Sequence, residues 1–590
     1  MPISRLFDLL SRFQENIGKN DALVGKENGI WKKYSSKEVI DEVNYISYGL
    51  LKLGVGKEDK IAIIANNRPE WNIVDLGILQ TGAVDVPIYP TISEHDLKFI
   101  FNDSQIKYAF VSNADLYKKV KAVAVEVKSV KEIYTFNSVH GAKSWTEVLE
   151  LGKQNKDDAK LRSIKDSIKE TELASILYTS GTTGEPKGVM LSHKNILSNV
   201  LAVRNTPPLT EFTSSSKALS FLPLNHIYER MITYVYIYLG VSIYYAESIE
   251  TIADNLKEIK PDIFTTVPRL LEKVYDRIVA KGYEQTGIKK KLFFWALDLG
   301  LKYEVNGANG WWYELQLKIA NKLIFNKWRE GLGGNVKAAV SGGAALQVRL
   351  AKVFNAARIP VYQGYGLTET SPVISTNNSA PGGLVFGTSG TLIPGVEVKI
   401  AQDGEILCKG PNVMMGYYKR PDATAEAIDK DGWFHTGDIG EMVDGKYLKI
   451  TDRKKEIFKT SGGKYIAPLM IENKLKESPF IEQVLVFGEG QKFASALIVP
   501  AFTYIKDWFG KKGESYISNE AASKDSEVIA QIKEHIEDVN KTLAQYETIK
   551  KFELLPAEWS IAKGEMTPKM SLKRKIILDA NKNLIENIYS

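Results

Sequence analysis

The sequence predicts an α/β protein with a large N-terminal domain, residues 1–451, and a small α+β C-terminal domain, residues 452–590. Three observations support this fold class. Apolar runs of strand length alternate with helical patterns over most of the chain, which is typical of parallel sheets covered by helices. Beyond about Val385 the strands become shorter and Gly and Asn turns separate them, which is typical of antiparallel pairing. With 590 residues, the chain also exceeds what one hydrophobic core usually organises.

The alternation begins between about residues 37 and 90. A helical pattern, a strand, a second helix and a second strand follow one another as EVIDEVNYISYGLLKLG, IAIIA, EWNIVDLGILQTGA and VDVPIY. Six further apolar runs continue the predicted sheet: YAFVS, ASILYTS, KALSFLP, DIFTTVP, KAAVSGG and PVYQGYG. Several of these runs end in small or polar residues. Because ligands bind at the carboxyl ends of parallel strands, we expect the functional site at that edge.

Two later segments, GVEVKIAQDGEILCKG and EMVDGKYLKITD, predict the antiparallel part. The basic segment DRKKEIFK then precedes a smaller region of mixed strands and helices, so we place the domain boundary between Thr451 and Asp452. The run without charges at residues 231–246 is about sixteen residues long, below the roughly 20 that span a bilayer. Its β-branched and tyrosine-rich composition predicts buried strand or core.

Composition argues against several classes of protein. Cys408 is the only cysteine, so no intrachain disulfide forms, and the six histidines lack the spacing of a zinc site. The net charge of +6 is small for this length and is not concentrated in one tail, which argues against nucleic acid as a partner. The start, MPISRLFDLLSRF, is amphipathic and lacks the apolar core of a signal peptide. We expect a cytoplasmic protein.

Residues 178–193, YTSGTTGEPKGVMLSH, place hydroxyls, glycines and one lysine between two apolar strands. Such a loop offers backbone N–H groups and hydroxyls to a polyphosphate, with Lys187 as a point charge. It is not a Walker loop, because the order G-x-x-x-x-G-K-[ST] fails and the strand-like GVML follows in place of a helix. An ordinary glycine-rich hairpin is the alternative interpretation of this segment.

This segment resembles the phosphate loop of the acyl-adenylate-forming enzymes, the superfamily of acyl-CoA synthetases, firefly luciferase and the adenylation domains of peptide synthetases. The resemblance extends over nearly the whole chain, because further motifs follow in the expected order. It implies that the loop holds the β- and γ-phosphates of ATP through Thr179, Ser180, Gly181, Thr182, Thr183, Gly184 and Lys187.

Two glycine-containing motifs, SGGAAL and YQGYGLTET, resemble the superfamily's adenine-side turn and central nucleotide motif. The resemblance implies that Tyr365 flanks adenine, Thr368 bonds the α-phosphate and Glu369 ligates Mg²⁺. A carboxylate beside phosphates needs such a cation, which usually enters with one or two carboxylates, phosphates and water. The nucleotide-binding residues implied by both motifs are Gly342, Gly343, Ala344, Gly364, Tyr365, Gly366 and Thr368.

Two motifs farther along the chain resemble the ribose-binding part of the superfamily. GWFHTGDIG contains Asp438, and ITDRKKEIFKTSGGKYIAP contains Arg453. The resemblance implies that both side chains hydrogen-bond the ribose hydroxyls, which suits a carboxylate acceptor. Taken singly, Asp438 is more often a turn residue and Arg453 a surface charge. Their order after the phosphate loop favours nucleotide binding.

Two further motifs concern the acyl and thiol groups. His226, in FLPLNHIYER, falls where the superfamily has an aromatic residue that lines the acyl and thiol channel, and it is a candidate contact of the substrate carboxylate. A hydrogen-bonded core histidine is an equally weighted alternative. Ser461, Gly462 and Gly463 resemble the loop that turns toward the site for the second half-reaction, where glycine permits close approach of pantetheine.

The C-terminal segment GEMTPKMSLKRKII departs from the superfamily pattern. The superfamily places here a lysine that reaches the substrate carboxylate and the α-phosphate during adenylation. Ser571 occupies that position in this chain, and Lys569 and Lys573 flank it, so one of these two lysines is the predicted catalytic residue. By the same resemblance the C-terminal domain is mobile, and Lys455 occupies the hinge position.

Within the superfamily, FLPLNHIYER and TTVPRLLEKVYDRI resemble long-chain fatty acid CoA ligases. The implied reaction joins a fatty acid to ATP, giving acyl-AMP and pyrophosphate, and then to coenzyme A, giving acyl-CoA and AMP, with Mg²⁺ as the metal. An acyl-AMP ligase or another carboxylate–CoA ligase is the nearest alternative. A catalytically silent nucleotide- or lipid-binding protein is the alternative from another class. Acyl length and oligomeric state are not predicted by any motif.

Two basic amphipathic patterns, IKKKLFFWALDLGLKY and WWYELQLKIANKLIFNKW, precede SGGAAL. They predict helices with an apolar stripe and lysines elsewhere on the surface. Such helices either dock on the large domain or form a peripheral surface, on the inner face of the cell membrane, that receives fatty acid. The residues of the second pattern are Trp312, Leu315, Ile319 and Leu323 in the stripe, and Lys318, Lys322 and Lys327 outside it.

Overall fold

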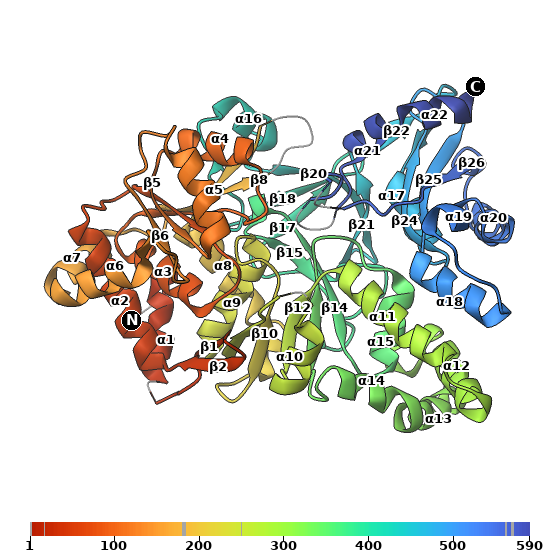
Figure 1. The fold of residues 1–590 in the computed structure, drawn as a ribbon, viewed down its shortest axis with the longest axis horizontal. Helices are drawn as coiled ribbons and strands as arrows, with labels where there is room; N and C mark the ends of the chain where they lie inside the picture. Colours follow the sequence, from red (N-terminus) through yellow and green to blue (C-terminus); the bar gives the residue numbers. More distant parts are fainter. Residues whose placement is uncertain (1–2, 17, 180–184, 249, 561–562, 568–570) are drawn as a thin grey trace.

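A computed structural model describes residues 3–16, 18–179, 185–248, 250–560, 563–567 and 571–590. Two large sheets with helices around them form the N-terminal part, and a smaller group of strands and helices forms the C-terminal part, at the upper right of Figure 1. Parallel strands build the centre of both large sheets. The predicted α/β class, with a smaller α+β C-terminal part, is confirmed.

The first sheet has eight strands within the described ranges, and the predicted runs IAIIA, VDVPIY, YAFVS and ASILYTS form four of them, β3, β4, β5 and β8. Strands β8, β4, β3, β5, β6 and β7 run parallel, whereas β9 and β19 are antiparallel to their neighbours. The GVML run after the glycine-rich loop is β9, a strand as expected. In spatial order the strands are β19 (Gly416–Tyr417), β9 (Lys187–Ser192), β8 (Leu173–Thr179), β4 (Val84–Pro87), β3 (Lys60–Ile64), β5 (Ile106–Val111), β6 (Glu132–Thr135) and β7 (Lys143–Ser144).

The second sheet has thirteen strands in the part of the chain that the structure describes. Its parallel half runs from β14 to β1, and its antiparallel half contains the two hairpins predicted after Val385. In spatial order the strands are β17 (Glu397–Ile400), β18 (Glu405–Lys409), β20 (Phe434–Val443), β21 (Tyr447–Arg453), β16 (Thr391–Leu392), β15 (Val373–Thr376), β14 (Val361–Gly366), β13 (Ala338–Ser341), β12 (Ile263–Thr266), β10 (Lys217–Ser220), β11 (Ser242–Tyr245), β1 (Leu23–Glu27) and β2 (Ile30–Tyr34).

Helices connect and cover these strands. Short 3₁₀ turns lie at η1 (Leu6–Leu9), η2 (Leu209–Glu211), η3 (Val305–Gly307) and η5 (Thr368–Thr370), and a π-helical turn at η4 (Asn321–Phe325). The α-helices of the N-terminal part are α1 (Leu10–Glu15), α2 (Ser36–Lys52), α3 (Pro69–Gln80), α4 (Glu94–Ser104), α5 (Ala114–Ala124), α6 (Trp145–Gln154), α7 (Asp158–Ser167), α8 (His193–Val203), α9 (Ile227–Leu239), α10 (Ile252–Ile259), α11 (Pro268–Tyr283), α12 (Gly287–Leu301), α13 (Trp311–Ala320), α14 (Asn326–Gly331), α15 (Val348–Ala356) and α16 (Pro421–Ala427).

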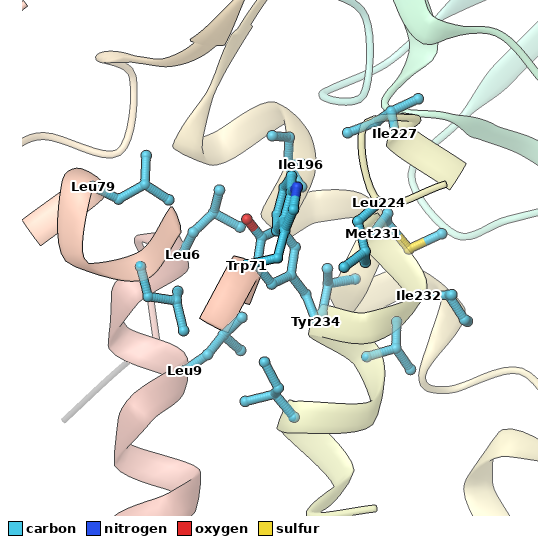
Figure 2. Close-up of a cluster of buried hydrophobic side chains, with 14 of the residues drawn as sticks. Leu6, Leu9, Trp71, Leu79, Ile196, Leu224, Ile227, Met231, Ile232 and Tyr234 are labelled. Atoms are coloured by element: carbon cyan, nitrogen blue, oxygen red, sulfur yellow. The ribbon is translucent and has the colours of Figure 1, made fainter. Parts of the chain in front are cut away.

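The largest hydrophobic core lies around helices α3, α8 and α9. Figure 2 shows Trp71 of α3 and Tyr234 of α9 among aliphatic side chains of the N-terminal turns and of α8. The apolar run at residues 231–246 is therefore core, as predicted, but the strand interpretation holds only for its second half, β11. Its first half belongs to α9. Because α9 is buried on nearly all sides, it has no polar face to give a helical period.

A fully buried ionic network fixes α9 in this core. The guanidinium of Arg230 lies 2.6 Å from Asp75 of α3 and 2.9 Å from Asp85 of β4, and all three side chains are excluded from solvent. Arg230 also donates to Ser175 of β8. Burial raises the pKa of both carboxyls, and the guanidinium opposes this shift. Since buried charges are costly unless paired, the network ties α9 to one orientation between the helices and the first sheet.

The C-terminal part has a hydrophobic core of its own, built from residues between Phe458 and Ile588. The predicted boundary between Thr451 and Asp452 lies inside β21, and the division into domains stays a prediction. No helix in the described ranges is both long and apolar enough to cross a membrane. The elements of this part are β22 (Phe458–Lys459), β23 (Tyr465–Ile466), β24 (Ile481–Phe487), β25 (Ala494–Pro500), β26 (Ile549–Leu554), α17 (Pro468–Leu475), α18 (Phe502–Lys512), α19 (Asn519–Ser523), α20 (Ser526–Asn540), α21 (Arg574–Ala580) and α22 (Lys582–Tyr589).

Candidate active site

A cavity of about 1080 Å³ lies where the two large sheets meet the C-terminal part. Its walls include the carboxyl ends of β8 and β14 and the turn after β13, which is the edge that the strand pattern predicted. Residues of the sequence-predicted site that line the cavity are Thr179, Lys187, His226, Gly342, Gly343, Gly364, Tyr365, Gly366, Thr368, Glu369, Asp438, Arg453 and Lys573.

The phosphate-loop strands place a hydroxyl and a lysine at one end of the cavity. Thr179 is the last residue of β8 and pairs with Lys187, the first residue of β9. The Nζ atom of Lys187 lies 5.1 Å from the centroid of the Tyr417 ring, within range of a cation–π contact. The predicted loop residues Ser180, Gly181, Thr182, Thr183 and Gly184 lie outside the described residues.

The central motif brings Glu369 to the tyrosine that Lys187 also contacts, Tyr417. Gly366 ends β14, and a Cβ atom there would approach the carbonyl oxygen of Pro372 to 1.8 Å, so only glycine fits. The chain then turns into η5, which carries Thr368 and Glu369. Tyr417 donates its hydroxyl to Glu369 Oε1 at 3.0 Å, and burial with this carboxylate raises the pKa of Tyr417. The sequence analysis missed Tyr417, since no local pattern indicates this contact.

Asp438, Arg453 and Tyr365 meet at another part of the cavity wall. Asp438 and Arg453 are paired residues of β20 and β21, and Arg453 Nε lies 3.5 Å from Asp438 Oδ1. Tyr365 donates its hydroxyl to Asp438 Oδ2 at 2.7 Å. Burial raises the pKa of Asp438, although Arg453 and the Tyr365 hydroxyl oppose that shift. The structure therefore brings together the three residues that the resemblance assigns to adenine and ribose.

The turn after β13 contributes Gly342 and Gly343 to the cavity wall, whereas Ala344 is exposed and does not line the cavity. Gly342 donates its N–H to the carbonyl oxygen of Thr266 at the end of β12. Tyr228 of α9 donates its hydroxyl to the carbonyl oxygen of Val340, at 2.9 Å, and also lines the cavity. The first turn of α9 is thus joined to β13.

His226 precedes α9 and caps it. Its Nδ1 atom accepts the N–H of Tyr228 at 3.0 Å, and the side chain lines the cavity. Beyond it the walls become apolar, with side chains from α8, α9 and the segment that leads to η2. The sequence analysis missed this segment, because Pro and Leu residues in a loop give no period. The apolar lining residues that come from these three elements are Val203, Pro207, Pro208, Leu209, Met231 and Ile232.

The C-terminal part closes the cavity. Met566, Thr567, Ser571 and Lys573 line it, whereas Lys569 lies outside the described residues. The predicted second loop, Ser461, Gly462 and Gly463, is exposed and is not part of the lining. Lys454, beside the expected hinge, pairs with Asp403 at 2.7 Å and with Glu405 at 2.8 Å. In this arrangement, the segment that carries Lys573, called the lysine-bearing segment below, lines the cavity, whereas the loop of Ser461, Gly462 and Gly463 faces solvent.

Glu229 leads to a prediction about stability and pH. Its side chain is fully buried in the first turn of α9, and burial raises its pKa from 4.5 to about 7. The folded state therefore favours the neutral form, so the stabilisation is complete below about pH 4.5 and is lost as the pH rises through about 7. We expect Glu229→Gln to gain about 2 kcal/mol over the wild type in free energy of unfolding between pH 5 and pH 8.

Urea unfolding of both proteins at several pH values measures this difference. The exposed Glu284→Gln is the matched control, and its curve is expected to run parallel to that of the wild type. A parallel curve for Glu229→Gln would contradict the prediction.

Comparison with known proteins identifies the family. The sequence model of the AMP-binding enzyme family matches residues 12–418, and that of the AMP-binding enzyme C-terminal domain matches residues 455–590. The chain belongs to the AMP-binding enzyme family. Among its relatives in this family, it is 33% identical to long-chain-fatty-acid–CoA ligase FadD15 of Mycobacterium tuberculosis, over 95% of this chain and 93% of that protein. It is also 33% identical to human long-chain-fatty-acid–CoA ligase 1, over 95% of this chain and 82% of that protein.

Solved structures show that the AMP-binding fold extends over the whole chain. A Mycobacterium tuberculosis fatty acyl CoA synthetase aligns with a TM-score of 0.64 and 21% identity, covering 99% of both chains. The anthranilate CoA ligase AuaEII in complex with anthranoyl-AMP aligns with a TM-score of 0.74 and 17% identity, covering 99% of this chain and 98% of that chain. At these identities the similarity establishes the fold.

Proposed function

We propose that this AMP-binding enzyme activates a long-chain fatty acid with ATP, forming acyl-AMP and pyrophosphate, and then transfers the acyl group to coenzyme A. One observation carries the proposal: a single cavity joins a polar end, with Lys187, Glu369 and the Asp438–Arg453 pair, to an apolar wall built from α8, α9 and the chain before η2. ATP suits the polar end, and an alkyl chain suits the apolar wall. The names of the relatives, long-chain-fatty-acid–CoA ligases, support the same substrate class.

We propose for these residues the nucleotide roles that the resemblance implies, and their positions in the cavity support this proposal. Asp438 accepts hydrogen bonds from the ribose hydroxyls, with Arg453 beside it, and the ring of Tyr365 flanks adenine. Gly342, Gly343, Gly364 and Gly366 let the base and ribose approach the backbone. Thr179, Lys187, Thr368 and residues 180–184 bind the phosphates. Ala344 is exposed, so we propose that it contacts no part of the nucleotide and only helps to shape the turn after β13.

Magnesium is the metal that this site suits. Among the described residues, no group of three or more His, Cys, Asp or Glu side chains is placed to hold a metal without help from substrate. A single carboxylate such as that of Glu369 is enough to bind Mg²⁺ when phosphate oxygens and water supply the other ligands. Glu369 is therefore the proposed ligand, oriented by Tyr417. When bound, Mg²⁺ neutralises charge on the phosphates.

Lys573 is the proposed catalytic lysine of adenylation. Its segment lines the cavity, so an ammonium group there offsets the charge that arises when the fatty acid carboxylate attacks the α-phosphate. His226, at the boundary between polar and apolar walls, is the candidate contact of that carboxylate. Ser461, Gly462 and Gly463 face solvent, so we propose that the C-terminal part rotates near Lys455 to present them to the acyl-AMP for thiol attack.

A panel of carboxylic acids from acetate to arachidate, scored for AMP release with and without coenzyme A, tests the proposal. We expect release that depends on both a long-chain acid and coenzyme A. Acid-dependent release of pyrophosphate with accumulation of acyl-AMP, and no release of AMP when coenzyme A is added, indicates an acyl-AMP ligase. Release of AMP with a short or aromatic acid and coenzyme A indicates a different carboxylate–CoA ligase. Absence of any acid-dependent exchange between ATP and pyrophosphate would support a silent binding protein.

A second observation favours contact with a membrane. Trp311, Trp312, Leu315, Ile319 and Leu323 are all exposed on α13 and η4, the two tryptophans by 78% and 58%. Residues 287–331 hold eight Lys or Arg and four Asp or Glu, a net charge of +4 in a chain of net charge +6. Tryptophans beside lysines suit the headgroup region of an anionic bilayer. We propose that this surface, residues 311–323, docks on such a bilayer.

Flotation with vesicles tests this surface. At low salt, the wild type is expected to float with phosphatidylglycerol vesicles and not with phosphatidylcholine vesicles, and Trp311→Ser/Trp312→Ser is expected to lose most of the binding. Val125→Ser, at another exposed apolar position, is the control. A wild type that stays at the bottom of the gradient contradicts the proposal, and a dimer that the double substitution dissociates would assign the surface to a second copy.

A further inference from the structure

A chain of polar contacts crosses from the N-terminal part to the C-terminal part, outside the cavity. Arg269 lies in the first turn of α11 and forms an ion pair with Glu482 of β24. The same guanidinium lies 3.3 Å from Glu272, one turn along α11. The side chains of Arg269 and Glu482 are only 16% and 18% exposed. An ion pair this shielded is screened less by salt than a surface pair.

The contacts continue to a second crossing point. Glu272 accepts from Gln347 Nε2 at 2.9 Å, and Gln347 accepts from Arg349 Nε at 2.7 Å. Arg349 then donates to the carbonyl oxygen of Lys476, the C-terminal cap of α17, at 3.2 Å. The network thus joins two segments of the N-terminal part to two segments of the C-terminal part. Figure 1 shows α11 directly below the C-terminal part, next to α18.

On the N-terminal side, the network begins at the cavity wall. Arg269 follows β12 by three residues, and the end of β12 accepts the N–H of the cavity residue Gly342. Gln347 and Arg349 follow the same glycine turn after β13. The position of the guanidinium is therefore tied to the strands that shape the nucleotide site.

On the C-terminal side, the network ends beside the lysine-bearing segment. Gln483 is the neighbour of Glu482 on β24, and the pairing of β24 with β25 shifts register at this point, between Ile481 and Gln483. Gln483 donates to the carbonyl oxygen of Trp559 at 3.2 Å and accepts the N–H of Trp559 at 2.8 Å. It also lies 3.6 Å from the sulfur of Met566, which lines the cavity. Strand β24 therefore links Arg269, through Glu482, to the segment that carries Lys573, through Gln483.

We propose that the Arg269–Glu482 pair is a latch that holds the C-terminal part in the arrangement in which Lys573 faces the cavity. Arg269 and Glu482 thus act as positioning residues, because they keep Lys573 in place for adenylate formation. This role rests on the proposed function. A latch acts by stabilising one of two domain arrangements, so breaking it lowers the population that is competent for adenylation. It leaves the residues that contact the nucleotide in place.

The latch shares its task with other contacts, which limits the expected effect. The rings of Tyr283 and Tyr504 lie 6.1 Å apart across the same boundary, and Lys454 pairs with Asp403 and Glu405 near the hinge. We therefore expect about a tenfold loss from breaking Arg269–Glu482 alone, which is within the usual range of coupling for one contacting pair.

Charge reversal and charge exchange test the latch. Arg269→Glu and Glu482→Arg are each expected to slow fatty-acid-dependent exchange between ATP and pyrophosphate about tenfold. The double variant Arg269→Glu/Glu482→Arg is expected to recover most of the rate. Transfer of the acyl group from supplied acyl-AMP to coenzyme A is expected to stay at the wild-type rate or to rise. Reversal of the exposed pair, Lys524→Glu/Glu520→Lys, is the matched control within the C-terminal part.

A distance measurement separates the latch from the chemistry. Ile288 and Ile517 are exposed on the two parts, and the native Cys408 is buried, so nitroxides on Ile288→Cys and Ile517→Cys report the arrangement of the parts by electron spin resonance. We expect one distance in the background of the wild type, a broader distribution with Arg269→Glu, and a single distance again after charge exchange. An unchanged distribution in both single reversals would overturn the latch. If no acid supports exchange between ATP and pyrophosphate in the wild type, the proposed function fails. The distance distributions still show in that case whether the Arg269–Glu482 pair holds the two parts in one arrangement.

Discussion

Replacing Glu369 by Gln is expected to slow acyl-AMP formation by at least about 100-fold, because changes in the outer shell of a metal site already cost about 10- to 100-fold. Gln keeps the size of the side chain and its contact with Tyr417 but removes the negative charge. Exchange between ATP and pyrophosphate at increasing Mg²⁺ concentration measures the loss. We also expect ATP binding in the variant to depend far less on Mg²⁺ by calorimetry.

Two variants bracket this result. Glu426→Gln removes another carboxylate that lines the cavity, and its rate is expected to stay close to that of the wild type. Tyr417→Phe keeps the carboxylate and removes the hydrogen bond that orients it, so its loss is expected to be smaller, about 10-fold. A Glu369→Gln enzyme with a near-normal rate and a normal Mg²⁺ dependence would remove Glu369 from the role of ligand.

Replacing Lys569 and Lys573 one at a time by Ala is expected to stop acyl-AMP formation in one variant only. We expect that variant to be Lys573→Ala, because the Lys573 segment lines the cavity. Losing a group that stabilises charge in the transition state typically costs about 10²- to 10³-fold. Exchange between ATP and pyrophosphate measures adenylation, and thioester formation from supplied acyl-AMP measures the second half-reaction, which is expected to survive.

Lys575→Ala is the matched control, since Lys575 is exposed and does not line the cavity. A loss confined to Lys569→Ala would move the catalytic role to that residue. If neither change slowed adenylation, the assignment of this segment would fail, and Ser571, at the superfamily's lysine position, would mark a chain that has lost the first half-reaction.

Much of the fold was predictable because its signals are local. A buried parallel strand needs a short apolar run, and a turn that approaches a ligand closely needs glycine, as at Gly366, so β3, β8, β13 and β14 were recognisable one by one. The same local logic failed at residues 231–246, where a helix buried on nearly all sides shows no helical period. The sequence also left open whether Trp312 docks on the large domain or lies exposed, because an apolar stripe usually faces a core, and only the structure shows that it is exposed.

The amino-acid sequence by itself determined the α/β class, the order of the motifs and the membership in the adenylate-forming superfamily, because each depends on residues that are neighbours in the chain. Only the tertiary structure decided that Tyr417 reaches Glu369, that Lys573 faces the cavity while Ser461 faces solvent, and that Arg269 meets Glu482. These contacts join residues 48 to 213 positions apart. Their existence depends on how strands pair and how the two parts of the chain meet, and no local pattern of residues encodes that arrangement.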